Sequence, residues 1–245
     1  MPETIDLLLK ELKLPTFIRY YQRHQEQAIE KGYGHIRYLS GLCEQEIADR
    51  YQKRVQKWTS EATLPAGKRF TNLDLTELSA SVQQQFVALK DQTDWAHRAE
   101  NVLLIGPSGV GKSHMAAAIT YHLIEQNVRV KWCLAVALVH SLQQAKRDLD
   151  LMTAMTRLNK YQVLVIDDIG YVKKTDAETQ VLFEFIAHRY ESGRLIITSN
   201  QPFSQWDHIF PDTMMTVAAI DRILHHATII EIEGESYRKK QSLKK

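Results

Sequence analysis

One eight-residue stretch constrains this chain more than any other: residues 106–113 read Gly-Pro-Ser-Gly-Val-Gly-Lys-Ser. The stretch follows an apolar run at 102–105 and precedes a helix-forming run at 115–119. Its three glycines allow the backbone to turn N–H groups toward an anion, and the helix that follows directs the positive end of its dipole there. The pattern therefore predicts a strand, a phosphate-binding loop and a helix, in that order.

Two side chains of this loop have distinct expected roles. Lys112 would reach the β- and γ-phosphates of a nucleotide, and the Ser113 hydroxyl would bind Mg²⁺. The residues expected to bind the nucleotide are the whole loop and the residue after it: Gly106, Pro107, Ser108, Gly109, Val110, Gly111, Lys112, Ser113 and His114.

Composition narrows the class of protein. The 245 residues carry a formal net charge of only +2, so nucleic-acid binding would depend on where the charges lie. No apolar run approaches the roughly 18 residues of a membrane span, and the acidic, amphipathic start is unlike a signal peptide. We therefore expect a cytoplasmic protein with no membrane partner. Cys43 and Cys133 lack metal-binding neighbours in the sequence, and we expect both to be buried.

The first part of the chain has helical spacing. One apolar face runs from Ile5 to Leu12, Pro15 ends that pattern, a second helix reaches about residue 30, and a third runs from 36 to 59. On the third helix an apolar stripe recurs every four residues: Leu39, Cys43, Ile47, Tyr51 and Val55. We expect a small all-α domain at 1–69 and a core at 70–245.

Basic residues crowd the end of the third helix and the linker after it: Arg50, Lys53, Arg54, Lys57, Lys68 and Arg69. Such a flank is more often a solvated face than a binding surface. Here the strip faces almost no acid, and a phosphate backbone is the commonest partner of such a strip. The sequence favours DNA binding by this helical domain and leaves the solvated face open.

From residue 102 onward, strand-like and helical stretches alternate. Strands are expected at 102–105, 128–134, 163–166, 195–198 and 228–232, with helices at 135–149 and 175–190. This alternation predicts an α/β domain with a parallel sheet, helices on both faces, and a ligand at the carboxyl ends of the strands.

Polar residues follow two of these strands. Asp167 would emerge beside the phosphate loop and hold Mg²⁺ through water, while Asp168 would orient or deprotonate the water that attacks the γ-phosphate. The alternative for Asp168 is a cap of the turn at 169–170. Asn200 would hold the same water or serve as a turn residue. Arg222 would stabilise charge on a phosphoryl group bound by a neighbouring subunit, or form a surface ion pair.

Five segments in order resemble the IstB-like proteins. They are the phosphate loop, Ile-Asp-Asp-Ile-Gly at 166–170, the segment 197–203 with Trp206, the helix at 219–226, and Gly-Glu-Ser-Tyr-Arg at 234–238. IstB-like proteins are AAA+ helper ATPases encoded beside the transposase of certain bacterial insertion sequences, and they are similar to the DnaC helicase loaders. The resemblance runs from about residue 12 to residue 238.

The resemblance implies a fold and a set of roles. The fold is an AAA+ core with five parallel strands in the order 5-1-4-3-2, binding ATP between subunits of a ring or helical filament. Residues 106–113 match the Walker A loop, and Asp167 and Asp168 match Walker B. Asn200 matches sensor 1, Arg222 the arginine finger, and Arg238 the sensor 2 region. DNA contact is implied for a helix at 139–160 with four basic residues: Lys146, Arg147, Arg157 and Lys160.

Two departures from the wider AAA+ pattern modify these expectations. Walker B ends Asp-Asp instead of Asp-Glu, and the shorter Asp168 predicts slow hydrolysis suited to a switch. The chain ends soon after the fifth strand, which predicts no C-terminal helical lid.

The expected function is an ATP-dependent, DNA-binding regulator of transposition. It would assemble on double-stranded DNA and recruit or activate a partner transposase. A replicative helicase loader is the alternative and would bind single-stranded DNA and a hexameric helicase. A small-molecule kinase is a third hypothesis, but it leaves Asn200, Arg222 and the basic helix unexplained.

Overall fold

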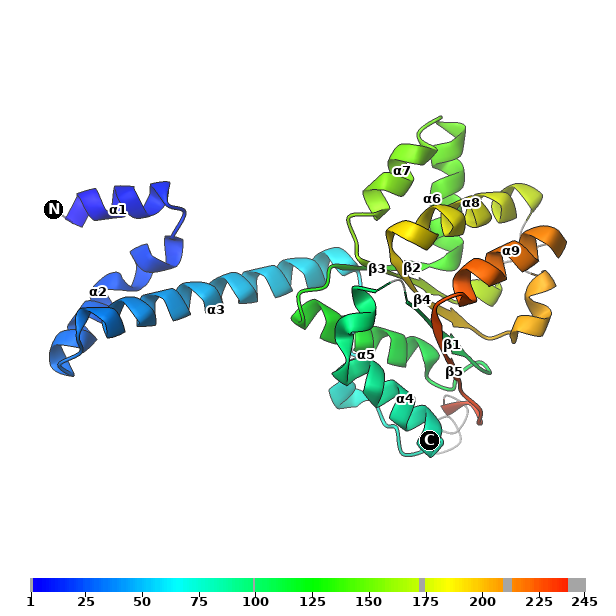
Figure 1. The fold of residues 1–245 in the computed structure, drawn as a ribbon, viewed down its shortest axis with the longest axis horizontal. Helices are drawn as coiled ribbons and strands as arrows, with labels where there is room; N and C mark the ends of the chain where they lie inside the picture. The colour runs from blue at the N-terminus through cyan, green and yellow to red at the C-terminus, as the bar shows by residue number, and fades with distance from the viewer. Residues whose placement is uncertain (1, 99, 172–174, 209–212, 238–245) are drawn as a thin grey trace. The chain divides into compact units, whose positions relative to one another are not determined.

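The chain forms two compact units, Met1–Lys57 and Trp58–Lys245, in the computed structural model, which describes residues 2–98, 100–171, 175–208 and 213–237. Figure 1 shows the helices of the first unit and the sheet of the second. The domain boundary predicted at residue 69 stays a prediction. The C-terminal tail, Arg238 included, lies outside the described residues, and so does the end of the chain on which the expected absence of a lid depends.

The first unit consists of α1 (Pro2–Glu11), α2 (Pro15–Glu30) and most of α3 (His35–Ala62). Pro15 begins α2, where the first helical turn tolerates a residue without a backbone N–H. Leu9, Phe17 and Leu42 are buried together, one from each helix. These three side chains form the small core of this unit.

A buried carboxylate joins α3 to the start of α2. Glu46 accepts a hydrogen bond from the backbone N–H of Thr16 (3.0 Å) and another from Arg50 Nε (2.6 Å). Burial alone would raise the pKa of Glu46, but these hydrogen bonds outweigh it and lower the pKa. The carboxylate therefore caps α2 in place of a local capping side chain, which α2 lacks.

The apolar stripe predicted on α3 is not the face that packs in this unit. Leu39 and Ile47 are 53% and 68% exposed, whereas Leu42 is buried. The expectation that Cys43 is buried is wrong, because this thiol is exposed on the same stripe. Helical spacing identifies residues that share a face, but it does not say which face meets a neighbour. Cys133 is half-buried, and burial raises the pKa of its thiol.

The second unit contains a five-stranded parallel sheet in the order β2-β3-β4-β1-β5. This order is the predicted one read from the other edge. The strands are β1 (Asn101–Ile105), β2 (Val130–Leu134), β3 (Val163–Asp167), β4 (Arg194–Ser199) and β5 (Ala227–Glu231). Every residue of β1 and β3 is buried, as a central strand covered on both faces requires.

Helices cover both faces of this sheet (Figure 1). One face carries α4 (Ala80–Asp91) and α5 (Lys112–Glu125), and the other carries α6 (Ala135–Arg147), α7 (Leu151–Leu158), α8 (Asp176–Ser192) and α9 (Thr213–Leu224). Single 3-10 turns occur at Phe70–Asn72, Thr93–Ala96, Ile169–Tyr171 and Phe203–His208. None of the helices within the described ranges is both long and apolar enough to cross a membrane.

The segment between β2 and β3 agrees with the helix expected at 135–149 from the apolar pattern, but not with the single helix at 139–160 that the resemblance implied. Instead of one helix to residue 160, it forms α6 and α7, separated by a turn in which Leu149 has a φ of 57°. The Leu149 side chain is 95% exposed. Neither glycine nor proline marks this turn, and the end of the helical pattern near residue 149 is the signal that the sequence carries for the break.

A buried arginine fixes the approach to β3. Arg189 of α8 is fully buried, and it donates hydrogen bonds to the carbonyls of Leu158 (3.1 Å) and Gln162 (3.3 Å) and to that of Tyr161. Burial lowers its pKa to about 10. A Cβ on Gly193 would overlap the guanidinium, which shows how closely the chain surrounds this charge. The arginine therefore ties the end of α8 to the turn that leads into β3.

We expect Arg189→Met to lower the free energy of unfolding of this unit by about 3 kcal/mol, because several carbonyls lose the buried guanidinium that donates to them. Urea unfolding followed by tryptophan fluorescence measures this, since all four tryptophans lie in this unit: Trp58, Trp95, Trp132 and Trp206. Arg98→Met is the control, because Arg98 pairs with Asp94 (3.6 Å) on the surface. Equal effects of the two substitutions would contradict the structural role of Arg189.

Candidate functional site

The phosphate loop connects β1 to α5, and its glycines adopt conformations that other residues rarely reach. Gly106, Gly109 and Gly111 have φ values of 155°, 88° and 100°. A Cβ on Gly106 would overlap the carbonyl oxygen of Ile232, whereas nothing lies within 4 Å of one on Gly111. Close approach of the chain therefore requires glycine at 106, and backbone conformation alone favours it at 111.

Lys112 is held by the loop itself. Its side chain is almost fully buried, and Nζ donates hydrogen bonds to the carbonyls of Gly106 and Pro107, both at 2.7 Å. These contacts satisfy a charge that would be costly to bury alone. The ammonium group is therefore already positioned inside the loop.

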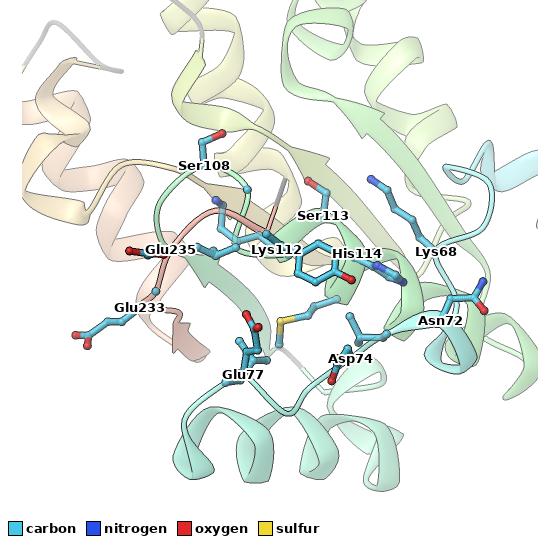
Figure 2. A pocket seen from close by; sticks show the side chains of 18 of the residues that line it. Lys68, Asn72, Asp74, Glu77, Ser108, Lys112, Ser113, His114, Glu233 and Glu235 are labelled. Carbon is cyan, nitrogen blue, oxygen red and sulfur yellow. The ribbon is translucent and has the colours of Figure 1, made fainter. Parts of the chain in front are cut away.

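A pocket of about 690 Å³ lies against this loop (Figure 2), within the usual range of small-molecule sites, roughly 300–1,000 Å³. Three segments and one separate residue form its walls: residues from 67 to 78, the loop from 108 to 115, residues from 233 to 237, and Asp168. From the segment before α4, Asn72, Leu73 and Asp74 line the pocket. Phe70 instead packs on Phe86, with ring centroids 5.3 Å apart.

Most predicted nucleotide-binding residues line this pocket: Ser108, Gly109, Val110, Gly111, Lys112, Ser113 and His114. Gly106 and Pro107 do not line it and contribute the carbonyls that hold Lys112. The sequence missed the third wall, which follows β5. There the N–H of Tyr237 donates to the carbonyl of Gly109 (3.0 Å), and a Cβ on Gly109 would overlap Ser236.

Acidic side chains outnumber basic ones around the pocket. The acids are Asp74, Glu77, Asp168, Glu233 and Glu235, and the basic side chains are Lys68, Lys112 and His114. Figure 2 shows Glu77, Glu233 and Glu235 on the walls around Lys112. This balance means that a phosphate-rich ligand needs cations in addition to those of the loop.

The acidic pair, Asp167 and Asp168, lies at the carboxyl end of β3, which pairs with β4. Asp167 is buried at the end of β3, and its Oδ1 accepts a hydrogen bond from the hydroxyl of Thr198 (2.6 Å). The backbone N–H of Asp168 donates to that same hydroxyl (2.9 Å), and Asp168 has a φ of 61°. Sequence reasoning did not single out Thr198, although a polar residue in a buried apolar strand is a usable signal.

Asn200 lies one residue beyond β4, beside the turn after β3. A Cβ on Gly170 would overlap its Oδ1. This oxygen is buried and has no hydrogen-bond partner in the part of the chain that the structure describes. An unpaired buried oxygen is uncommon in folded proteins and indicates a group that a ligand or water completes.

The family of IstB-like ATP binding proteins matches residues 7–245 of this chain. The chain belongs to this family. An insertion-sequence ATP-binding protein of Sinorhizobium fredii is 41% identical over 98% of this chain and 80% of its own length. The IS21 ATP-binding protein of Pseudomonas aeruginosa is 32% identical over 98% of this chain and 90% of its own length.

Solved structures share the fold of this IstB-like chain. DnaI has a TM-score of 0.57 at 21% identity, covering 69% of this chain and 95% of its own. The DnaC helicase loader has a TM-score of 0.53 at 18% identity, covering 69% and 99%. DnaA bound to AMPPCP and single-stranded DNA has a TM-score of 0.58 at 15% identity, covering 74% and 56%. The IstB-like chain is thus an ATP-binding protein with an AAA+ fold.

Arg222 of the IstB-like chain lies away from the pocket of the same chain. This residue of α9 donates from Nη1 to the carbonyl of Ala218 (2.9 Å), and its guanidinium lies 5.4 Å from the ring centroid of Phe183. It is absent from the residues that line the pocket.

The basic residues predicted to bind DNA lie in several environments. Arg50 is engaged by Glu46 and by the carbonyl of Lys13 (2.7 Å). Lys53 and Lys57 are exposed on α3, and the Arg54 guanidinium lies 5.6 Å from the ring centroid of Tyr51.

Two of these basic residues follow α3 and lie near the pocket. Lys68 lines the pocket, and Arg69 lies over the ring of Tyr121 and near Glu125 (3.5 Å). The basic residues predicted to form one strip from 50 to 69 are therefore divided between the two units, with Arg50 to Lys57 in the first and Lys68 and Arg69 in the second.

The four basic residues between β2 and β3 differ in their partners. Lys146 pairs with Glu184 (2.9 Å), and Arg157 pairs with Asp150 (3.6 Å). Arg147 and Lys160 are exposed and form no ion pair with a residue inside the described ranges. These two residues keep their full charge available to a ligand.

We expect Gly106→Ala to weaken nucleotide binding at least about 10-fold, because the new Cβ displaces the loop from the Ile232 carbonyl. Titration with a fluorescent ATP analogue measures the affinity. Gly34→Ala is the control, since Gly34 has open space around it and no positive φ. Unchanged affinity in Gly106→Ala would contradict the required close approach.

Proposed function

We propose that this IstB-like chain is an ATPase that regulates DNA transposition from the cytoplasm. ATP drives its assembly on double-stranded target DNA, the assembly recruits or activates a partner transposase, and slow hydrolysis releases it. The observation that carries the proposal is the pocket, which is lined by both the Walker A loop and Asp168. Its relatives, which include the IS21 ATP-binding protein of Pseudomonas aeruginosa, are proteins of insertion sequences.

The loop residues bind the phosphates. Backbone N–H groups of residues 108–113 and the start of α5 attract the negative charge, and the buried Lys112 exchanges its carbonyl partners for the β- and γ-phosphates. The hydroxyl of Ser113 and the carboxylate of Asp167 are hard oxygen donors, which fit Mg²⁺. Mg²⁺ bound there would neutralise charge on the β- and γ-phosphates.

In the proposed hydrolysis, the residues that follow two neighbouring strands act on the water. Asp168 on the pocket wall accepts a proton from the attacking water or orients it, and the unpaired Oδ1 of Asn200 holds the same water. Asp168 is one methylene shorter than the glutamate of most AAA+ proteins, which makes water positioning less efficient. We therefore propose slow turnover, as suits a switch.

The site is completed by a second copy of the chain. Arg222 lies off its own pocket, which supports a role on the ATP of a neighbouring subunit. Arg238 contributes from the sensor 2 region. The homo-oligomer is a ring or a helical filament.

DNA meets the helical domain at 1–69 and the α6–α7 region. Phosphate contacts by Lys and Arg give affinity with little sequence information, so binding is salt-sensitive and largely independent of sequence. The alternative is a replicative helicase loader, which the shared fold of DnaC and DnaI favours. Both structures are less similar in sequence than the insertion-sequence relatives.

The mass of the protein on duplex and single-stranded oligonucleotides, with and without ATP, tests the proposed function. We expect large complexes on the duplex that require ATP, that Lys112→Ala abolishes, and that persist longer with a nonhydrolysable analogue. A preference for single strands would favour the helicase loader. A nucleotide-bound monomer that ignores DNA would contradict the proposal.

Arg147 and Lys160 are expected to contribute more to duplex affinity than Lys146 and Arg157, because the latter pair is already engaged by carboxylates. We expect Arg147→Ala with Lys160→Ala to weaken binding about 10-fold and to reduce the salt slope by about 2. Lys146→Ala with Arg157→Ala is the matched control, with the same change in charge. Equal losses in the two double variants would contradict this ranking.

A further inference from the structure

Thr198 contacts both members of the acidic pair through hydrogen bonds. It is fully buried in β4, in line with Asp167 of the adjacent strand, since Ile197 pairs with Ile166 in the parallel register. Its hydroxyl lies 2.6 Å from Asp167 Oδ1 and 2.9 Å from the backbone nitrogen of Asp168. One oxygen atom therefore connects the end of β3 to the turn after it.

The direction of both hydrogen bonds follows from their chemistry. A backbone nitrogen only donates, so the Thr198 oxygen accepts from Asp168. The single hydroxyl proton is then left for Asp167, whose ionised carboxylate only accepts. A short bond from a hydroxyl to a carboxylate is charge-assisted and strong, and in a buried site the two bonds strengthen each other. Thr198 therefore fixes the orientation of the Asp167 carboxylate.

The same hydroxyl fixes the turn that carries Asp168. A φ of 61° is uncommon for a residue other than glycine and persists where neighbouring groups enforce it. The bond from the Asp168 N–H to Thr198 is such a constraint, and the turn places Asp168 among the pocket-lining residues. The Thr198 side chain thus contributes both to the orientation of the Asp167 carboxylate and to the placement of Asp168.

We propose, on the basis of the ATPase function proposed above, that Thr198 is a positioning residue for the metal-nucleotide site. It orients the Asp167 carboxylate toward Mg²⁺ and holds Asp168 at the position of the attacking water. Thr198 contacts neither nucleotide nor metal. The alternative is a purely structural role, in which the Thr198 hydroxyl stabilises β4 without affecting the nucleotide site.

Thr198→Ser and Thr198→Ala differ by one oxygen atom, and comparing them distinguishes a positioning role from a purely structural one. Thr198→Ser keeps the hydroxyl, Thr198→Ala removes it, and Thr198→Val is a second variant without the hydroxyl that fills the original volume. The control is Thr120→Val, which removes an equally buried hydroxyl that donates to the Ala116 carbonyl (2.7 Å) in α5. Affinity for a fluorescent ATP analogue is measured in EDTA and across a Mg²⁺ titration, and kcat and KM are measured separately.

We expect the variants without the hydroxyl to need about 10- to 100-fold more Mg²⁺ for half-maximal nucleotide binding, as for other residues that orient metal ligands. Their affinity in EDTA stays at the wild-type value, their kcat falls more than their KM rises, and Thr198→Ser restores Mg²⁺ dependence to within about 3-fold. Thr120→Val behaves as wild type.

Two results would overturn the role of Thr198. One is equal Mg²⁺ dependence in Thr198→Ser and Thr198→Ala. The other is a loss of affinity in EDTA as large as the loss in Mg²⁺, which indicates general damage to the fold. Wild-type protein that binds ATP but never hydrolyses it, with or without DNA, would refute the proposed ATPase function, while the Mg²⁺ titration would still decide the orientation of Asp167 by Thr198.

Discussion

Two backbone hydrogen bonds hold the start of the phosphate loop between the neighbouring strands of the sheet. The N–H of Gly106 donates to the carbonyl of Ser199 at the end of β4 (3.2 Å), and the carbonyl of Ile105 accepts from the N–H of Ile232 beyond β5 (2.7 Å). Because β1 lies between β4 and β5 and all strands are parallel, their carboxyl ends meet at one edge. The loop and both flanking segments begin at this edge.

Polar groups buried at this edge are paired with one another before any ligand binds. Carbonyls of the loop hold the ammonium of Lys112, and the Thr198 hydroxyl holds Asp167. In a low-dielectric environment such pairs resist rearrangement, so the groups proposed to bind phosphate and metal are preorganised. Asn200 and Arg222 differ, because the first has an unpaired oxygen among the described residues and the second lies away from the pocket. The proposed hydrolysis would therefore depend on the groups that complete the site.

The sequence predicted the elements that short-range patterns encode. Apolar runs of strand length revealed all five strands, and the glycine pattern located the loop. The strand order was correct because of the family resemblance, since periodicity does not specify which strands are neighbours. Predictions failed where distant contacts determine the structure: the face of α3 that packs, and the pocket wall from 233 to 237. Thr198 and Arg189 were missed because their roles depend on partners about 30 residues away.

The segment after β5 links the charge of the pocket to the geometry of the loop. Its Tyr237 N–H is bonded to the Gly109 carbonyl, and its Glu233 and Glu235 line the pocket that the phosphates would enter. Carboxylates on a pocket wall repel a free nucleotide more strongly than a metal-bound one, since the metal removes two negative charges. A ligand that moved Gly109 would also move this segment. A metal-bound nucleotide would therefore meet less repulsion at this wall than a free one, and a ligand on the loop would act on residues 233–237 through the bond to Gly109.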